Sequence, residues 1–138
     1  MAIIEYVANL DESLGEMIGV EFEKFAAANG VVCNYAPFSF VAKESGEVIG
    51  IITGHSYYGE AHILDLIVCA PHRGKHIGSQ LMEAAENHHR GKGFTHIALS
   101  TYRFQAPGFY EKCGYRVEFI REHKRDPHLD KFFLVKPL

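Results

Sequence analysis

Long apolar runs are missing from this sequence. No stretch approaches the about 18 consecutive apolar residues that identify a membrane-spanning helix. The first residues also lack the basic stretch and the long apolar segment of a secretory signal. The three cysteines, Cys33, Cys69 and Cys113, are odd in number and widely spaced, which is typical of reduced thiols rather than of a disulfide framework. These absences predict a cytoplasmic protein with no membrane partner.

A large charge of either sign is also missing. The net charge is −3 with neutral histidines, and nonspecific nucleic-acid binding needs a basic face. We therefore expect no nucleic-acid partner. The 138 residues are 47% hydrophobic, which is enough apolar material for the core of one domain covering residues 1–138.

Hydrophobic periodicity divides the chain into helices and strands. Helices are expected from an N-cap at Asp11 to Gly30, over residues 77 to about 89, and over residues 107–113. The expected strands cover residues 2–7, 37–43, 48–54, 60–68, 97–101, 115–120 and 131–135. This order indicates a mixed sheet with helices packed on it.

One turn between a strand and a helix carries the clearest functional signal. Residues 73–78 are basic and rich in glycine, and they follow the apolar run 63–68. The first turn of a helix has backbone N–H groups without partners and a partial positive charge. Glycine lets a ligand approach this backbone closely, and Arg73 and Lys75 add two full charges. The turn therefore predicts a site for an anion such as a pyrophosphate.

Two common nucleotide motifs do not fit this turn. The Walker pattern needs Ser or Thr after Gly-Lys, whereas His76 follows Lys75 and Gly93 follows Lys92. The Gly-x-Gly-x-x-Gly spacing of dinucleotide-binding proteins does not occur around Gly74 and Gly78. A third possibility remains, which is the pyrophosphate of coenzyme A.

Two segments together resemble the GNAT N-acetyltransferases. Residues 71–78 are similar to the acetyl-CoA-binding motif of that family, Arg/Gln-x-x-Gly-x-Gly/Ala. Residues 105–115 are similar to its Asn-x-x-Ala-x-x-Phe-Tyr-x-x-x-Gly-Phe segment. The two motifs occur in the family's order with a strand between them. The resemblance covers residues 38–138 well, and the first third only in the order of its elements.

The resemblance implies a fold, a reaction and a set of binding residues. The fold is α+β or α/β, with a mixed, mostly antiparallel sheet of about six to seven strands and helices on both faces. The reaction moves an acetyl group from the cosubstrate acetyl-CoA to a primary amine of a small molecule, peptide or protein. A homodimer is the assembly that the family suggests, and the oligomeric state stays open. The implied cofactor-binding residues are Leu66, Ile67, Val68, Arg73, Gly74, Lys75, His76, Ile77, Gly78, Ser79, Gln105 and Phe109.

Two residues depart from the family pattern. His76 occupies the usual position of the middle glycine, so a positive φ there would strain it mildly. Gln105 occupies or neighbours the position of the usual asparagine, and it keeps the amide group on a longer side chain. His76 is the one feature that favours an alternative function, a catalytically weak sensor domain that binds acyl-CoA.

The resemblance places the family's general-acid tyrosine at Tyr110. This acid would protonate the departing thiolate. The alternative interpretation is a tyrosine that only packs in the core or against the cofactor. The carbonyl oxygen needs a donor as it gains charge, and the resemblance implies a backbone N–H near Ile67 or Val68.

The base that deprotonates the amine is expected on the strand before the turn, where Glu60, His62 and Asp65 are candidates. An odd count separates His62 from Asp65, so they face opposite sides of a regular strand, and only one can face the amine unless a bulge intervenes. Structural roles for both residues, and a water chain to solvent in place of a base, stay open. Acidic and aromatic residues that could line a cleft for a cationic amine are Tyr35, Phe38, Tyr57, Tyr58 and Glu60.

A metal site is not expected. His72 and His76 are four residues apart, as on a zinc-binding helix, but the basic, glycine-rich residues between them disfavour both a helix and a cation. A nucleotide-binding regulatory domain is a third reading, and the sequence holds no Walker or kinase motif for it.

Overall fold

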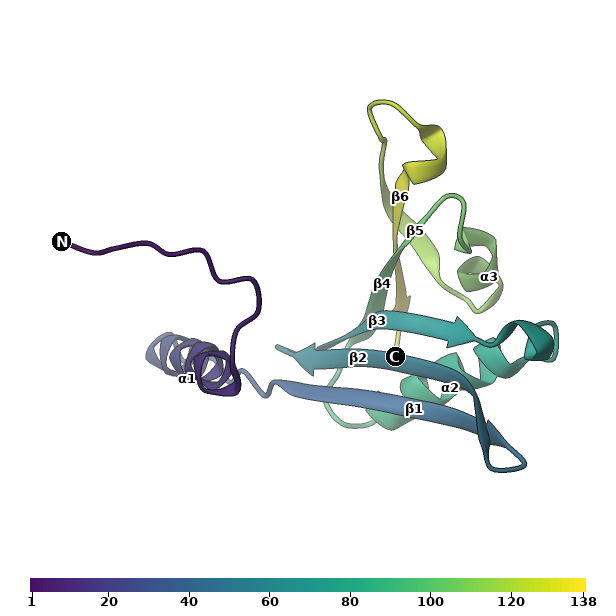
Figure 1. Ribbon diagram of the computed structural model, residues 1–138. Helices are drawn as coiled ribbons and strands as arrows, with labels where there is room; N and C mark the ends of the chain where they lie inside the picture. The colour runs from purple at the N-terminus through teal and green to yellow at the C-terminus, as the bar shows by residue number, and fades with distance from the viewer. The chain divides into compact units, whose positions relative to one another are not determined.

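The computed structural model describes residues 1–138, which form two compact units, residues 1–34 and residues 35–138. The first unit contains one helix, α1 (Glu12–Ala28), drawn in purple in Figure 1. Asp11 caps its start as expected, because the Asp11 carboxylate accepts a hydrogen bond of 2.9 Å from the backbone N–H of Leu14. None of the helices in the chain is both long enough and apolar enough to cross a membrane.

The strand expected at residues 2–7 is absent, so this prediction was wrong. The segment has an irregular backbone and pairs with no strand. An isolated strand leaves its backbone groups without partners, and side-chain alternation alone does not stabilise it.

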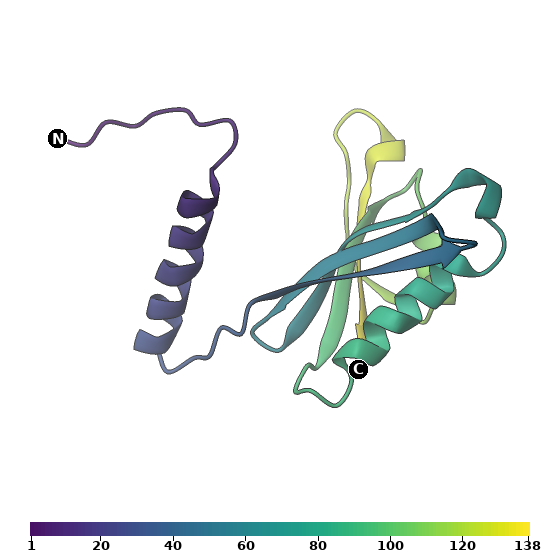
Figure 2. The same ribbon diagram turned by 60° about the horizontal axis from the view of Figure 1, so that its bottom comes forward.

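Six strands of the second unit form one mixed sheet in the order β1-β2-β3-β4-β6-β5 (Figures 1 and 2). All neighbouring strands are antiparallel except β3 and β4, which are parallel. The expected α+β fold class is confirmed, and every element expected after residue 35 is present. The elements are β1 (Ala36–Glu44), β2 (Glu47–Tyr57), β3 (Glu60–Val68), the short helix Ala70–His72, α2 (Ile77–His89), β4 (His96–Tyr102), α3 (Pro107–Lys112), β5 (Arg116–Arg121), the short helix Pro127–Leu129 and β6 (Lys131–Pro137).

Two tight turns fold β1, β2 and β3 into a meander. Ser45 and Gly46 have φ values of 50° and 81°, and Tyr58 and Gly59 have φ values of 51° and 79°. Turns with two positive φ angles match the right-handed twist of the strands that they join. These turns therefore fix the register in which β2 pairs with both of its neighbours.

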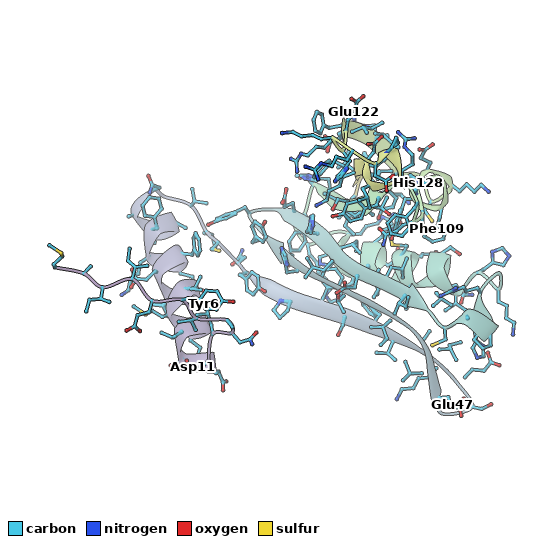
Figure 3. The ribbon with its side chains drawn as sticks, turned by 45° about the horizontal axis from the view of Figure 1, so that its top comes forward. Tyr6, Asp11, Glu47, Phe109, Glu122 and His128 are labelled. Carbon is cyan, nitrogen blue, oxygen red and sulfur yellow. The ribbon has the colours of Figure 1, made fainter.

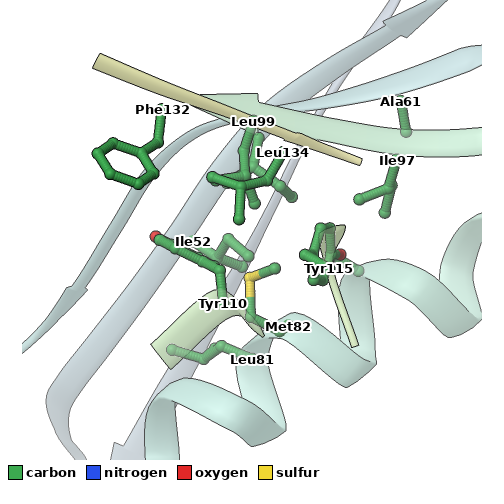
Figure 4. Close-up of a cluster of buried hydrophobic side chains, with 12 residues drawn as sticks. Ile52, Ala61, Leu81, Met82, Ile97, Leu99, Tyr110, Tyr115, Phe132 and Leu134 are labelled. Carbon is green, nitrogen blue, oxygen red and sulfur yellow. The ribbon is translucent and has the colours of Figure 1, made fainter. Parts of the chain in front are cut away.

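Helices α2 and α3 pack on the same face of this sheet. Leu81 and Met82 of α2 and Tyr110 of α3 belong to one buried cluster with strand side chains such as Ile52 and Leu99 (Figure 4). Ile52 is 0% exposed and Met82 is 1% exposed. We call the face covered by α2 and α3 the helix face, and the opposite face the second face.

A buried carboxylate ties α2 to the last strand. Glu86 of α2 is 4% exposed. It accepts hydrogen bonds from the Lys136 ammonium at 2.7 Å and from the Tyr115 hydroxyl at 3.1 Å, and the Arg90 guanidinium lies 3.5 Å away. Lys136 also donates to the carbonyl of Cys113 at 2.8 Å. This network joins α2, β6 and the segment after α3 through one charge.

Removing Lys136 should therefore be costly. The variant Lys136→Met leaves the Glu86 carboxylate buried with weaker partners, and we expect it to lower the free energy of unfolding by about 3 kcal/mol. Urea denaturation measures the change. The control is Lys112→Met, because Lys112 is exposed and pairs with no carboxylate. Equal stability of the two variants would contradict the structural role of this network.

Candidate active site

Strands β3 and β4 separate soon after they begin. They share three residue pairs, which join Glu60, Ala61 and His62 of β3 to residues 96–98 of β4. Beyond His62, β3 pairs only with β2, while β4 pairs with β6 along its length. Figure 1 shows the two strands running apart. One edge of β3, over residues 63–68, is therefore left without a neighbouring strand.

The backbone of Val68 points toward this free edge. Cys69 donates its N–H to Ile49 of β2 at 2.8 Å, and alternate residues of a strand point their backbone groups to alternate edges. Ile67 therefore bonds to β2, while Leu66 and Val68 face the free edge. The Val68 carbonyl accordingly accepts a hydrogen bond of 3.0 Å from the Arg73 guanidinium.

A bulge in β3 brings His62 and Asp65 to the same face. Ile63 pairs with Gly54 and Asp65 pairs with Thr53, so Leu64 is an extra residue without a partner. Ile63 remains in the core on the helix face, and His62 and Asp65 both lie on the second face. The sequence left such a bulge open as the exception to a regular strand, and the bulge shifts the alternation by one residue.

Asp65 is exposed, although it lies within an apolar run of the sequence. Its carboxylate accepts a hydrogen bond of 2.8 Å from the hydroxyl of Thr53, the residue opposite it on β2. Thr53 was missed in the sequence because a partner across two strands can be identified only once their register is known.

His62 is half-buried beside other rings. Its ring stacks on that of His55 at 5.6 Å, and the His55 ring also lies 5.1 Å from Tyr57 and 5.8 Å from Tyr35. Burial lowers the pKa of His62 below its ordinary value of 6.5, and the charges of His55 and Lys131 lower this pKa further, against the opposing effect of Glu60. A neutral His62 can accept a proton near pH 7.

Two other residues expected around the acceptor have structural contacts. Phe38 packs on the helix face, where its ring lies 4.6 Å from that of His89, so its expected place in an acceptor cleft was wrong. Side chains alternate between the faces of β1, and this position points to the core. The Glu60 carboxylate lies 3.0 Å from the Nε2 atom of His96, within hydrogen-bond distance.

The turn at residues 73–78 has the backbone expected for an anion site. Gly74 has a φ of 77°, and His76 has a φ of 64°, in the left-handed region where the family has glycine. No side chain caps the start of α2. The N–H groups of the first helical residues, 77–79, therefore have no acceptor within the helix. The exposed Arg73 and Lys75 flank Gly74.

Three elements meet at Gly78. A Cβ atom at this position would lie 3.2 Å from the ring of Phe109 in α3 and 3.8 Å from the side chain of Val68 in β3. Figure 3 labels Phe109. Glycine at position 78 therefore lets α3 approach the first turn of α2 and the end of β3.

Tyr110 lies next to this meeting point. Its side chain is 9% exposed, and its ring is 5.1 Å from Phe109 and 6.3 Å from Tyr115 (Figure 4). Burial, with a smaller effect from Cys113, raises the pKa of the Tyr110 phenol above its ordinary value. The phenol is therefore protonated near neutral pH and can act as a proton donor.

Gln105 has a structural contact at the end of β4. Its side-chain carbonyl accepts hydrogen bonds from the backbone N–H of Tyr102 at 3.1 Å and from the Thr101 hydroxyl at 3.4 Å. These bonds hold the loop between β4 and α3. The amide NH₂ of Gln105 is the part of the side chain left to meet a ligand.

The histidines form no cluster with other metal-ligand types. No group of three or more His, Cys, Asp or Glu side chains lies close enough to hold an ion. His72 lies 3.8 Å from the carboxylate of Glu44, and His76 is exposed.

Comparison with known proteins identifies the family. Residues 9–115 match the Acetyltransferase (GNAT) family. The chain belongs to this family. The resemblance seen in residues 71–78 and 105–115 is thereby confirmed.

The GNAT chain has relatives with named substrates. It is 38% identical over 80 residues, 57% of the chain, to the Blasticidin-S acetyltransferase of Streptomyces morookaense. It is 35% identical over 89 residues, 59% of the chain, to the aminoalkylphosphonate N-acetyltransferase of Salmonella typhimurium strain LT2. It spans 59% and 58% of the length of these two relatives. The crystal structure of an acetyltransferase from Bacillus cereus ATCC 14579 is 30% identical, with 97% of this chain and 98% of that one covered and a TM-score of 0.77.

The left-handed backbone at His76 gives a test of the turn in this GNAT chain. A β-branched residue fits this backbone poorly, so His76→Val should lower the free energy of unfolding by about 1–2 kcal/mol. His76→Gly should not destabilise the fold, because glycine adopts this φ without strain. Thermal denaturation compares both with Lys75→Val, whose exposed position has no positive φ. Equal losses at positions 75 and 76 would contradict the conformation described.

Proposed function

We propose that the protein moves an acetyl group from acetyl-CoA to a primary amine by direct attack. The observation that carries the proposal is the meeting of the free edge of β3, the uncapped start of α2 and the Tyr110 helix around Gly78. In this proposal residues 1–138 act as one N-acetyltransferase domain in the cytoplasm. The three free cysteines agree with that location.

The residues of the turn fit an acyl-CoA. The N–H groups of residues 77–79, with Arg73 and Lys75, offer donors and positive charge to a pyrophosphate. The backbone groups of Leu66 and Val68 point to the free edge of β3. They can form hydrogen bonds with the amides of an extended ligand arm, as they would with the backbone of a neighbouring strand. Because the Ile67 N–H points to β2, the Val68 N–H is our candidate donor to the carbonyl oxygen.

The side chains of the site supply the proton transfers. The amine nitrogen attacks the thioester carbonyl carbon, so that a C–N bond forms and the C–S bond breaks. The proton lost by the amine goes to His62 or Asp65 on the second face, and Tyr110 gives its proton to the departing sulfur. The neutral states favoured by burial at His62 and Tyr110 suit an acceptor and a donor of protons, respectively.

The relatives support an amine acceptor. The names of the two relatives described above state acetylation of blasticidin S and N-acetylation of aminoalkylphosphonates. Small-molecule amines are therefore the first acceptors that we would test.

The second candidate function is a sensor domain that binds acyl-CoA with weak catalysis. The non-glycine residue His76 in the phosphate turn is the observation that favours it. A panel of small primary amines, with release of the free CoA thiol as the readout, separates the two functions. A rise in Tm with acetyl-CoA, but not with ATP or NAD, establishes the ligand. Binding without thiol release for any amine would favour the sensor, and absence of binding would contradict both candidates.

Loss of the Tyr110 hydroxyl should slow turnover. Tyr110→Phe removes the proton donor and keeps the ring. Acid catalysis usually contributes about 10²–10⁴-fold, so kcat should fall at least about tenfold even when water substitutes in part. Acetyl-CoA affinity should change little. Steady-state kinetics measures the first quantity and calorimetry the second. Tyr115→Phe is a matched control, because the Tyr115 hydroxyl bonds to Glu86 and not to the site. Full kcat in Tyr110→Phe, with chemistry rate-limiting, would reduce Tyr110 to a packing residue.

The pH profile should identify the base. Because the pKa of His62 is lowered, kcat/KM should be retained down to pH 6.5 and should fall below it as the imidazole takes up a proton. His62→Gln should remove this acid limb and lower kcat/KM at pH 7 by about 10²-fold or more. Asp65→Asn should keep the limb. If the limb survives in His62→Gln and disappears in Asp65→Asn, then Asp65 is the base.

A further inference from the structure

The second face of the sheet continues from His62 across β4, β6 and β5. Tyr102 of β4 pairs with Lys131 of β6, and Lys131 pairs with Arg121 of β5. Two residues further along β6, Phe133 lies between Ser100 and Phe119 in the same way. Phe132 and Leu134, which alternate with these residues, point to the core on the helix face. The side chains of Tyr102, Lys131, Arg121, Phe133, Ser100 and Phe119 therefore form one continuous surface, which we call the cationic patch.

Two positive charges of the cationic patch lie over one ring. The Lys131 ammonium is 5.5 Å from the centre of the Phe133 ring, and the Arg121 guanidinium carbon is 5.1 Å from the same centre. Lys131 is also 5.8 Å from the Tyr102 ring. These contacts fix both side chains through cation–π attraction.

Neither cation is neutralised by a carboxylate. The ion pairs of the protein all involve other residues, including the nearby pair of Arg103 with Asp130 at 3.1 Å. Two like charges near one ring repel each other, and an anion between them would relieve this repulsion. The two cations are thus ordered by rings and lack a counter-charge.

The cationic patch lies near the candidate base. The charge of Lys131 is close enough to contribute to the lowered pKa of His62. Asp65 and Glu60 lie on β3 with His62, and their side chains are on the same face of the sheet. The second face therefore has acidic groups on β3 and basic groups on β6 and β5. A molecule with a positive end and a negative end matches this arrangement.

We propose that Lys131 and Arg121 bind an acidic group of the acceptor, so that the substrate is a primary amine that also bears a carboxylate, phosphate or phosphonate. The proposal rests on the acetyl transfer proposed above and adds the chemical class of its acceptor. The amine end faces His62 and Asp65, and the acidic end faces the cationic patch. The rings of Tyr102 and Phe133 border the acidic group and reduce its contact with water.

The test compares amines that differ in the acidic group alone. Ethanolamine phosphate is compared with ethanolamine, and 4-aminobutyrate with 4-amino-1-butanol. We expect kcat/KM to favour each acidic amine by about tenfold or more, the usual effect of a charge-assisted hydrogen bond. Lys131→Met should reduce this preference to near one by raising KM for the acidic amine, and Arg121→Gln should reduce it in part. Lys131→Arg should restore it.

The control is Lys43→Met, which removes the same charge from an exposed position on β1, three strands away from β4 in the sheet order. The preference should be unchanged in this variant. An active protein without a preference for acidic amines, or an equal preference in Lys131→Met, overturns the proposal and leaves the acetyl transfer intact. A change in oligomeric state in Lys131→Met with the preference unchanged also overturns it, because the patch would then contact a second copy.

Binding separates this proposal from the proposed reaction. Calorimetry with ethanolamine phosphate in the presence of CoA should show binding to the native protein and at least about tenfold weaker binding to Lys131→Met. If no amine is acetylated but this difference is found, the anion site stands and the proposed reaction fails. If the native protein neither binds ethanolamine phosphate nor prefers acidic amines, the anion site is refuted.

Discussion

The separation of β3 from β4 is the constraint on which the site depends. The two strands share hydrogen bonds only over residues 60–62 of β3, and the rest of β3 keeps one edge free. A buried strand edge costs free energy unless its groups find partners. Arg73 satisfies the Val68 carbonyl at this edge, and the N–H groups that face the same way are suited to bond to a ligand. The protein thus keeps unsatisfied backbone groups where a ligand can use them.

The bulge at Leu64 and the separation of the strands act together. The bulge sends His62 and Asp65 to the second face while Ile63 stays in the core. On the helix face of the same strand, α2 and α3 bring in the turn at residues 73–78 and Tyr110. A ligand bound along the edge and an acceptor on the second face would therefore meet at β3. The buried Glu86–Lys136 pair supports this arrangement, because it fixes α2 against β6.

The two faces of the sheet favour different protonation states of their side chains. On the helix face, burial keeps the Tyr110 phenol protonated, and the start of α2 offers positive charge to an anion. On the second face, burial and the nearby Lys131 keep the His62 imidazole neutral. The proposed reaction needs a proton donor on one side of the thioester and a proton acceptor on the other. The different surroundings of the two residues supply these states near the same pH.

The sequence by itself determined the elements after residue 10, the turn between β3 and α2, and the family. The periodicity of residues 60–68 and 77–89 is local, so β3 and α2 begin and end where it predicts. The left-handed backbone at His76 also followed from its place in the motif. Residues 2–7 alternate like a strand but found no partner, because pairing depends on distant segments. Only the tertiary structure decided the bulge, the contact of Phe109 with Gly78, and the approach of Lys131 to His62, since each depends on register or packing between elements far apart in the chain.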